Sequence, residues 1–587
     1  MPAGSTSLGA RKLSLSSQAA PPLMPDPFVL TVSGLDEGGH RVGTPVAIGS
    51  FDKLQGALEH LSREGGRSPW LWLRDGPHDA IDPAGALRAT KPSVDVLHAG
   101  LSNGLASLPH LLRFVQPTWM LQADAPASVE SSSWRVSLRS CLIRAEVLLQ
   151  MGGPCADFEM PEASWLDWGL RCVRAGVILR HVPSLALPPT LRSPVSLPVD
   201  DEVRLVVRNF GFKWALWALG RALRTGAMPV ARVSRGMAAA LRIRKEPQLT
   251  VPAYRRPVAE APATLAQAKV SVLIPTLDRY PYLETLLGQL EKQTVPPHEV
   301  IVVDQTEPGF RRFDLPGRYP GLCIQWLTMD QPGQCSSRNE GLRKASGEWI
   351  LFLDDDVEVP PDFLQRHLSV AEQFGADAVS GTVYEPPEER GASSEEDRIR
   401  VSDVFPTNTT LLKKEALAPA GLFDLAYDRG QVEDADLGMR LYLSGTLLLL
   451  DEGNCILHHH APRGGLRSHG ARVVTRAMAK RSPWHTALPS AWDFYLALRY
   501  FGEDAAREVE ALAVLQSFST GGSAWRRILR VAVGFALLPA TIARVLAAQR
   551  VGERLADQGP NIPSMASGAR GDEVDFVRDE TSSPAAR

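Results

Sequence analysis

The chain has 587 residues and a formal net charge of -3, with 44% hydrophobic and 22% charged residues. This composition is typical of a globular protein, the length predicts three or so domains, and the nearly balanced charge excludes a general attraction for nucleic acid. The six cysteines lack CxxC spacing, so neither a zinc site nor a disulfide framework is predicted, and a reducing, cytoplasmic location fits best.

Residues 1–26 are rich in Ser, Pro and Ala and contain no continuous apolar core, so we expect a disordered tail and no signal peptide. The first strand is expected at residues 28–32 of a region that extends to residue 200. Residues 201–262 form a connector, in which an aromatic helical pattern over 206–221 precedes several arginines. This connector either lies on an anionic membrane surface or is a packed helix followed by a solvated linker.

Residues 263–470 alternate strand and helix patterns. A β-rich run at 270–275, leucines at helical spacing and a buried run at 300–304 predict parallel strands in an open α/β sheet. Ligands bind beyond the carboxyl ends of such strands. This edge is where Thr276, Asp278 and Asp304 fall.

A third apolar run, residues 349–353, ends in Asp354, Asp355 and Asp356. Carboxylates packed this closely repel one another unless a cation neutralises them, and Mg²⁺ or Mn²⁺ prefers oxygen ligands. The pattern therefore predicts a metal site. The alternative is an acidic turn that caps the next helix.

Two helix starts carry further candidates. The Gly- and Ser-rich segment 331–337 leads into a helix that is expected to reach Ala345, and such a start can help hold an anion. Arg338 is expected near a diphosphate or the acid cluster, or else on the surface. Glu433 and Asp434 begin an amphipathic helix, where acids also suit the helix dipole.

These motifs together resemble family 2 glycosyltransferases of the GT-A fold, over roughly residues 269–470. The segments that carry the resemblance, in the family's order, are 272–276, 301–304, 337–341, 354–356 and 433–434. The resemblance implies an open mixed α/β sheet flanked by helices. It also implies transfer of a sugar from a nucleotide-sugar donor to an acceptor hydroxyl, with inversion at the anomeric carbon and a divalent metal, Mn²⁺ or Mg²⁺, on the diphosphate.

The resemblance also assigns roles. Asp434 is favoured as the catalytic base, with Glu433 close behind, and Asp354 and Asp356 are the expected metal ligands. Some family members add a late histidine; because neighbouring side chains on a strand alternate faces, we expect His458 or His460 rather than His459. The expected donor-binding residues are Pro275, Thr276, Asp278, Asp304, Arg338, Asp354, Asp355, Arg463 and Arg467. The last two arginines either close on the diphosphate or lie in a solvated basic loop.

The front of the chain resembles a second copy of the same plan. The aligned pairs are Gly169 with Gly438, Arg171 with Arg440, and Gly176 with Gly445. Under this alignment Ser164 and Trp165 replace the acid pair, while Arg74 and Gly76 replace two of the three aspartates. Residues 27–200 are therefore predicted to be a degenerate GT-A-like domain, used for acceptor binding, dimerisation or support of the active copy.

Residues 471–550 are helical in pattern. Their early aromatics either cover the acceptor or fill a core, namely Trp484, Trp492, Tyr495, Tyr500 and Phe501. The uncharged run 531–543, flanked by arginines, falls short of the roughly 18 to 20 apolar residues that cross a bilayer. It is expected to be a helix lying at the inner face of a membrane or an ordinary packed helix. Residues 551–587 are expected to be a disordered tail.

The sequence thus predicts a cytoplasmic, metal-dependent hexosyl- or deoxyhexosyltransferase of polysaccharide, lipopolysaccharide or glycolipid synthesis, peripheral to a membrane and acting on a glycan or lipid-linked acceptor. A nucleotidyltransferase is disfavoured because no GxGxRxxP-type loop follows the first strand. The open alternative is a non-catalytic module that binds nucleotide-sugars or glycans. Donor and acceptor identity depend on loop shapes that no sequence pattern specifies.

Overall fold

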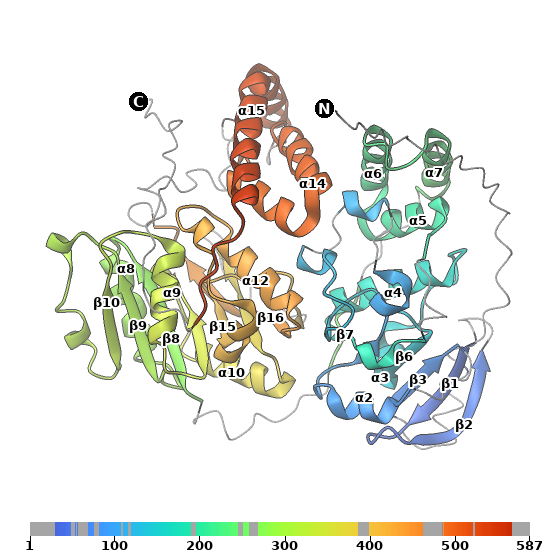
Figure 1. Ribbon diagram of the computed structural model, residues 1–587, viewed down its shortest axis with the longest axis horizontal. Helices are drawn as coiled ribbons and strands as arrows, with labels where there is room; N and C mark the ends of the chain where they lie inside the picture. The colour runs from blue at the N-terminus through green and yellow to red at the C-terminus, as the bar shows by residue number, and fades with distance from the viewer. Residues whose placement is uncertain are drawn as a thin grey trace, which may run out of the picture.

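The computed structural model describes residues 30–48, 53, 56, 69–75, 81–106, 110–115, 119–188, 195–244, 251–256, 268–384, 398–461, 484, 487–519 and 523–565. Two mixed β-sheets flanked by helices lie beside each other, and helical hairpins project from one side (Figure 1). This arrangement confirms the predicted α/β class and the helical C-terminal region.

The front sheet has the strand order β2-β1-β3-β6-β4-β7-β5. Its strands are β1 (Leu30–Leu35), β2 (Arg41–Ile48), β3 (Trp70–Arg74), β4 (Val96–His98), β5 (Ser131–Ser132), β6 (Ser140–Arg144) and β7 (Leu179–His181). The helices of this half are α2 (Pro83–Ala89), α3 (Ala145–Met151), α4 (Pro161–Ala175), α5 (Val199–Phe210), α6 (Phe212–Arg224) and α7 (Val230–Ile243).

The back sheet has the order β10-β9-β8-β11-β15-β13-β16-β12, with β14 paired to β16. Its strands are β8 (Val270–Thr276), β9 (Glu299–Asp304), β10 (Ile324–Thr328), β11 (Trp349–Phe352), β12 (Val357–Glu358), β13 (Ala378–Tyr384), β14 (Ile399–Val401), β15 (Thr410–Lys413) and β16 (Leu448–His458). The helices are α8 (Tyr280–Leu290), α9 (Gln334–Lys344), α10 (Phe363–Phe374), α11 (Leu417–Ala420), α12 (Glu433–Leu443), α14 (Ala491–Gln516) and α15 (Ala524–Gln558).

The two sheets share one pairing scheme. In the front sheet β3 pairs antiparallel with β6, β6 antiparallel with β4, β4 parallel with β7, and β5 antiparallel with β7. In the back sheet β11, β15, β13, β16 and β14 repeat this order and these directions. The correspondence ends at the outer strands, because β8 and β9 run parallel to β11 whereas β1 and β2 form an antiparallel pair beside β3.

The strand register corrects the predicted alignment of the acid cluster by one residue. Trp70 pairs with Arg144, as Trp349 pairs with Lys413. The position of Asp354 is therefore taken by Asp75 and not by Arg74. The Asp75 carboxylate accepts a hydrogen bond of 2.6 Å from Nε of Arg139, so a fixed guanidinium neutralises it.

The correspondence continues into the helices. In the front half α5 ends with Arg208-Asn209-Phe210, and a break at Gly211 (φ 91°) precedes α6. In the back half α14 bends at Gly502 (φ 77°) after Arg499-Tyr500-Phe501. Each segment bonds the aspartate of a helical Asp-x-x-x-Arg pair: Asn209 donates to Asp167 over 2.8 Å, and Tyr500 donates to Asp436 over 2.8 Å.

The two halves contact each other reciprocally through the glycines that follow α4 and α12. Gly176 has a φ of 101° and lies against the carbonyl of Ile399 at the start of β14. Gly445 has a φ of 93° and lies against the carbonyl of Glu130, which precedes β5. Arg180 of the front half also donates to the Gly445 carbonyl over 2.9 Å.

The C-terminal end departs from the predicted boundary at residue 551. Helix α15 runs to Gln558, and the carbonyls of Asn561 and Pro563 accept hydrogen bonds from the backbone of Leu425 and Leu422. Of the described residues, α15 is also long and apolar enough to cross a bilayer, with an 18-residue window of mean hydropathy 1.9. The sequence analysis counted only the uncharged run 531–543, which is too short to cross a bilayer. Arginines can nevertheless lie within a longer apolar helix, because their stems lie along apolar surface while their charged heads stay in water.

Candidate active site

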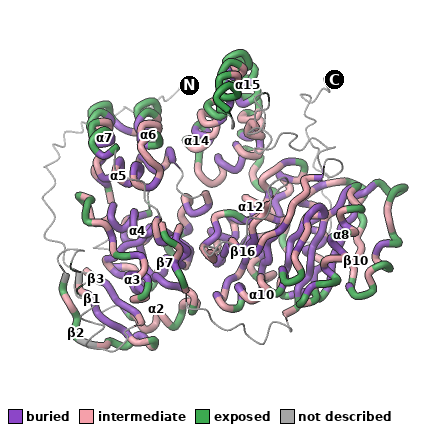
Figure 2. The backbone as a smooth tube through the Cα atoms, turned by 180° about the vertical axis from the view of Figure 1, so that it is seen from behind, coloured by how far each residue is buried: buried purple, intermediate pink, exposed green. Residues whose placement is uncertain are grey.

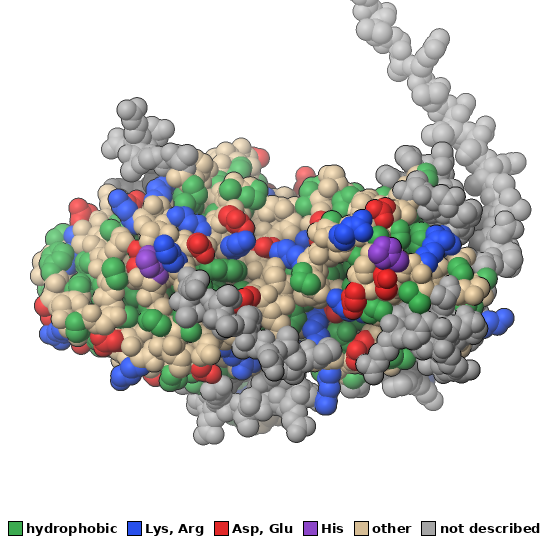
Figure 3. Space-filling view, turned by 90° about the horizontal axis from the view of Figure 1, so that it is seen from below, with side chains coloured by type: hydrophobic (Ala, Val, Ile, Leu, Met, Phe, Trp, Pro, Cys, Tyr) green, Lys and Arg blue, Asp and Glu red, His purple; other side chains and the backbone are tan. Residues whose placement is uncertain are grey.

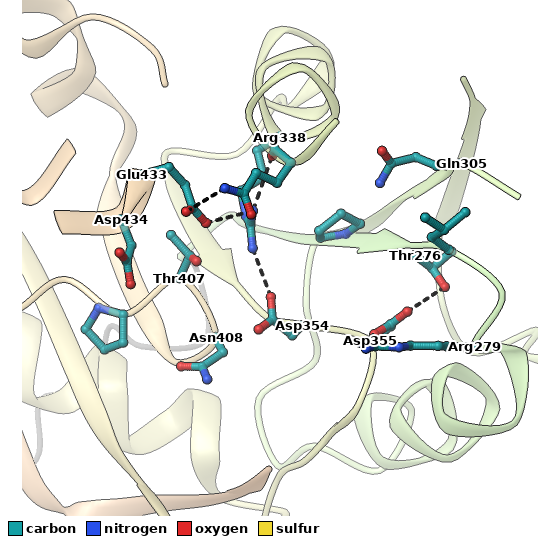
Figure 4. A pocket seen from close by; sticks show the side chains of 14 residues that line it. Thr276, Arg279, Gln305, Arg338, Asp354, Asp355, Thr407, Asn408, Glu433 and Asp434 are labelled. Carbon is teal, nitrogen blue, oxygen red and sulfur yellow. Dashed lines mark hydrogen bonds and ion pairs between the residues drawn. The ribbon is translucent and has the colours of Figure 1, made fainter. Parts of the chain in front are cut away.

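Parallel pairing brings the ends of β8, β9 and β11 to one edge of the back sheet. A cavity of about 290 Å³ opens there. It is lined by Pro275, Thr276, Leu277, Arg279, Gln305, Gln334, Arg338, Asp354, Asp355, Pro406, Thr407, Asn408, Glu433 and Asp434, and we call it the acid pocket (Figure 4). The acid cluster and the acid pair, 79 residues apart between Asp354 and Glu433 by their numbers, therefore meet in one cavity.

Arg338 connects these two acidic groups. Its Nη2 donates to Asp354 over 2.9 Å, and its Nη1 lies 3.4 Å from a carboxylate oxygen of Glu433 (Figure 4). The side chain is buried, which opposes its charge, but the carboxylates of Asp354 and Glu433 raise the pKa of Arg338. The guanidinium therefore stays protonated as a fixed positive charge in the pocket.

The acid pair begins α12 after an unusual backbone turn. Val432 has a φ of 64°, a left-handed conformation that is rare for a β-branched residue. Glu433 follows and is held from two sides, because Gln334 donates to its second oxygen over 2.8 Å. Asp434 accepts a hydrogen bond from the amide of Ala435 over 2.7 Å, and no described residue bonds its other oxygen.

Glu433 and Asp434 hold protons more tightly than ordinary carboxyl groups. Burial raises the pKa of Glu433 and of Asp434 above the ordinary carboxyl range. Repulsion from Asp434 adds to the rise at Glu433, while the Arg338 charge opposes it. A carboxylate that holds protons more tightly than usual is a stronger base once it is ionised.

Asp355 forms the floor of the pocket. Its carboxylate accepts hydrogen bonds from the Thr276 hydroxyl over 2.8 Å and from Arg279 over 3.1 Å. Burial raises the pKa of Asp355 to about 7, against the opposing charge of Arg279. These bonds tie the end of β8 to the acid cluster.

Three side chains beside the pocket fit a divalent cation. Asp354, Asp356 and His458 each offer a ligand atom, and these atoms lie within 4.8 Å of one another. The Oδ1 oxygen of Asp356 is buried, and among the described residues His458 Nε2 approaches it to 3.2 Å without ideal hydrogen-bond geometry. Two carboxylates and an imidazole suit Mn²⁺.

The neighbouring charges keep Asp356 ionised. Burial alone would raise its pKa, but His458, Arg279 and the amide of Ala461 hold the pKa of Asp356 below its ordinary range. An ionised carboxylate with a buried oxygen of this kind is suited to coordinate a metal.

Of the three consecutive histidines, His458 ends β16, and His459 and His460 follow it outside the strand. His458 faces Asp356, whereas His459 turns away and its Nε2 lies 2.6 Å from Glu358. The ring centre of His460 lies 4.0 Å from that of His458, and His460 has a φ of 50°. The geometry therefore joins His458 to the two aspartates.

The start of α9 differs from the expectation that it would hold an external anion. The amides of Cys335 and Ser336 donate to Asp428 over 2.8 and 2.7 Å, and the Ser336 hydroxyl adds a third bond. The protein's own carboxylate therefore caps this helix. The cap also fixes Gln334 and Arg338, which reach the pocket from the first turns of α9.

Two of the predicted donor-binding residues lie outside the acid pocket, and two others are not described. The Asp304 carboxylate is fully buried and bonds the Tyr280 hydroxyl and the Thr306 amide, so it does not line the pocket. Asp278 is exposed, with a φ of 58°, and also lies outside the pocket. Arg463 and Arg467 fall outside the described residues.

The pocket also contains side chains that the sequence analysis did not select. Arg279 lies directly after Asp278 and Gln305 directly after Asp304, so the strand ends were the correct place but the adjacent residue faces the cavity. Thr407 and Asn408 come from the turn before β15. No periodic pattern marks that turn, so only the fold reveals it.

Comparison with known proteins identifies the back half. Residues 271–423 match the family described as Glycosyl transferase family 2. The chain is 32% identical over 99 residues to the uncharacterized glycosyltransferase YwdF of Bacillus subtilis, an alignment that covers 17% of this chain and 36% of YwdF. It is 33% identical over 121 residues to undecaprenyl-phosphate 4-deoxy-4-formamido-L-arabinose transferase of Serratia proteamaculans, covering 20% of this chain and 36% of that protein.

Among solved structures, that of Staphylococcus aureus TarS residues 1–349 in complex with UDP-GlcNAc aligns at 18% identity with a TM-score of 0.31, covering 49% of this chain and 82% of that chain. The chain spans about a third of the length of the first curated relatives it matches. The motifs, the sheet and the match fall on the same stretch. Residues 271–423 therefore carry the chain's similarity to glycosyltransferase family 2.

Proposed function

We propose that this chain is a metal-dependent, inverting glycosyltransferase that moves a hexosyl or deoxyhexosyl group from a nucleotide-sugar to an acceptor hydroxyl in polysaccharide, lipopolysaccharide or glycolipid synthesis. The observation that carries the proposal is the double contact of Arg338 with Asp354 and Glu433. This contact puts a fixed cation, a group suited to bind metal and a pair of basic carboxylates at one cavity.

The residues of the pocket divide the work of a single displacement. Arg338 and Arg279 offer guanidinium groups to the donor diphosphate, and Thr276 and Asp355 hold the end of β8 against the acid cluster. Asp434 takes the proton of the acceptor hydroxyl through its unbonded oxygen. Glu433, held by Gln334 and Arg338, positions the start of α12.

A divalent cation held by Asp354, Asp356 and His458 would supply charge stabilisation for the leaving nucleoside diphosphate. In the described part of the front half, the counterpart of Asp354 is Asp75, and its carboxylate is paired with Arg139 instead of being open to a cation. We propose that residues 27–200 are a degenerate copy that supports the active one. The name of the Serratia relative, which includes undecaprenyl phosphate, supports a lipid-linked acceptor.

The proposal is tested by comparing the intact chain with Asp434→Asn, using a panel of UDP-, GDP- and dTDP-sugars with Mn²⁺. We expect donor binding to persist in calorimetry and turnover to fall about a thousandfold, as for the loss of a general base. Glu372→Gln, an exposed carboxylate on α10, is the matched control and should keep its turnover. Full turnover in Asp434→Asn would reject the role of the base, and silence of the intact chain across the panel would favour the binding module.

The proposed metal ligands, Asp354, Asp356 and His458, are tested by titrating the protein with Mn²⁺ and monitoring the bound metal by electron paramagnetic resonance. Removing one ligand, in His458→Ala, should weaken Mn²⁺ binding by at least about tenfold. The adjacent His459→Ala is the control, because that ring is directed to Glu358. Equal affinities in the two variants would exclude His458 as a ligand.

A further inference from the structure

Two helical hairpins project from one side of the molecule, and their ends expose apolar side chains and arginines. The α6–α7 hairpin and the α14–α15 hairpin extend in the same direction beyond the two sheets (Figure 1). Their ends carry many exposed residues (Figure 2). The hairpins occupy corresponding places in the two halves, each after an Arg-x-Phe-Gly segment.

Large apolar side chains are exposed at these ends. On α15 the exposed fractions are 60% for Trp525, 72% for Ile528 and 65% for Phe535. On the other hairpin, Leu223 and Val230 flank the turn and are 46% and 67% exposed. At 100° per residue Trp525, Ile528 and Phe535 fall on one face of α15, so they form a continuous apolar stripe.

The outer stretches of both hairpins carry positive charge and no acidic residues. No Asp or Glu occurs between Gly211 and Lys245 or between Ala511 and Gly552. Some of the arginines there are neutralised within the protein, as Arg221 of α6 is by Glu508 of α14 over 2.6 Å. Others remain exposed, including Arg224, Arg526 and Arg527. The opposite face, seen from below, intersperses acidic and basic side chains (Figure 3).

We propose that the two hairpin ends dock together on the surface of an anionic phospholipid bilayer. Apolar side chains enter the interface and the surrounding arginines contact lipid phosphates. This surface goes beyond the catalytic proposal, since it would serve any acceptor presented at a membrane. The chemistry of the partner follows from the pairing of an apolar stripe with arginines that have no acidic neighbours in sequence.

The hairpin geometry favours docking over crossing. The base of α15 is fixed to the body, because Val545 is buried and Gly552 packs tightly against the backbone of Ala491 at the start of α14. The start of α14 and the end of α15 are therefore both held at the catalytic half, on the same side of any membrane. The hairpin can then enter a bilayer only from that side.

The test is flotation of the full chain with vesicles of phosphatidylcholine, with and without phosphatidylglycerol. We expect binding to the anionic vesicles that weakens with salt. The double variant Ile528→Ser/Phe535→Ser should bind roughly 100-fold more weakly, because two large apolar side chains no longer enter the interface. Arg526→Ser/Arg527→Ser should lose roughly 25-fold on anionic vesicles and little on neutral ones.

Leu149→Ser is the matched control, since Leu149 is 64% exposed on α3 of the front half, away from the hairpins. It should bind like the unchanged chain, and all variants should keep the same thermal unfolding and nucleotide-sugar binding. Unchanged vesicle binding in the Ile528→Ser/Phe535→Ser variant would overturn the proposal. Self-association without lipid that this variant abolishes would also overturn it, because the occupant would then be a second copy of the chain.

Discussion

Arg338 sets the proton affinity of the acid pair, and this leads to a prediction about pH. Its charge opposes the rise in pKa that burial gives Glu433 and Asp434. In Arg338→Gln that opposition is lost, so both pKa values rise further and the base ionises only at higher pH. The acidic limb of the profile of kcat/KM against pH should therefore move to higher pH.

The control for this prediction is Arg343→Gln, on the same helix, where the arginine pairs with Glu340 instead of the acid pair. Its acidic limb should coincide with that of the unchanged protein. The readout is the position of the limb and not the height of the profile, because Arg338→Gln also removes a donor contact. A limb that stays in place or moves to lower pH would contradict the assignment.

At this scale the sequence located the strand ends but not the direction of each side chain. Arg338, Asp354, Asp355, Glu433 and Asp434, all selected on the sequence, line the acid pocket. After β8 and β9, Arg279 and Gln305 face the cavity. The aspartates that precede them do not, because Asp278 is exposed and the Asp304 carboxylate is bonded inside the protein. The side chain that faces a ligand depends on local backbone angles, such as φ 58° at Asp278, which no residue pattern encodes.

At the scale of elements, α14 is held on α12 by a partly buried arginine. Nη1 of Arg499 lies 2.7 Å from Asp424 and 2.8 Å from Asp436, and both carboxylates are fully buried. Arg499→Met would leave two buried negative charges without this partner. We expect a loss of about 3 kcal/mol in the free energy of unfolding.

Arg507→Met is the control on the same helix. Arg507 pairs with Glu503 and Asp504 at the surface, so its removal should change the free energy of unfolding by less than about 0.5 kcal/mol. Both values are measured by urea denaturation. Equal effects would show that α14 is not held by this buried contact.

The elements themselves were largely predictable. The runs at 270–275 and 300–304 became β8 and β9, and the acid pair begins α12, because alternating burial and amphipathic spacing are local properties of the sequence. Whether a helix start is open to a ligand depends on tertiary contacts, which the local sequence pattern does not show. The start of α9 has the composition of an anion site, but Asp428, from a loop far along the chain, already occupies it.

At the scale of the whole molecule, the two sheets share a central pairing scheme, but its details differ from the alignment made on the sequence. The glycine alignment falls on corresponding turns after α4 and α12, yet the register of β3 moves the acid cluster by one residue. The resemblance also extends beyond residue 200 into the helices, through the Arg-x-Phe-Gly segments. A short motif of this kind gains meaning only when its Asp partner on the preceding helix is known.

The contact between the halves gives the last prediction. A Cβ at Gly445 would lie 2.6 Å from the carbonyl oxygen of Glu130 in the front half, and that backbone cannot move without shifting β5. Gly375 has a left-handed backbone, with φ 56° and ψ 30°, but a Cβ there would meet no atom closer than 3.8 Å. Gly375→Ala should therefore cost about 1 kcal/mol, for the backbone conformation alone.

Gly445→Ala should cost about 2 kcal/mol more than Gly375→Ala, because the clash adds to the backbone penalty. Denaturation midpoints measure the difference, and limited proteolysis reports whether the two halves separate before they unfold. If the two substitutions cost the same, the halves do not depend on this contact. If Gly445→Ala instead loosens the joint while the acid pocket still binds nucleotide-sugar, the front half stabilises the assembly without shaping the site.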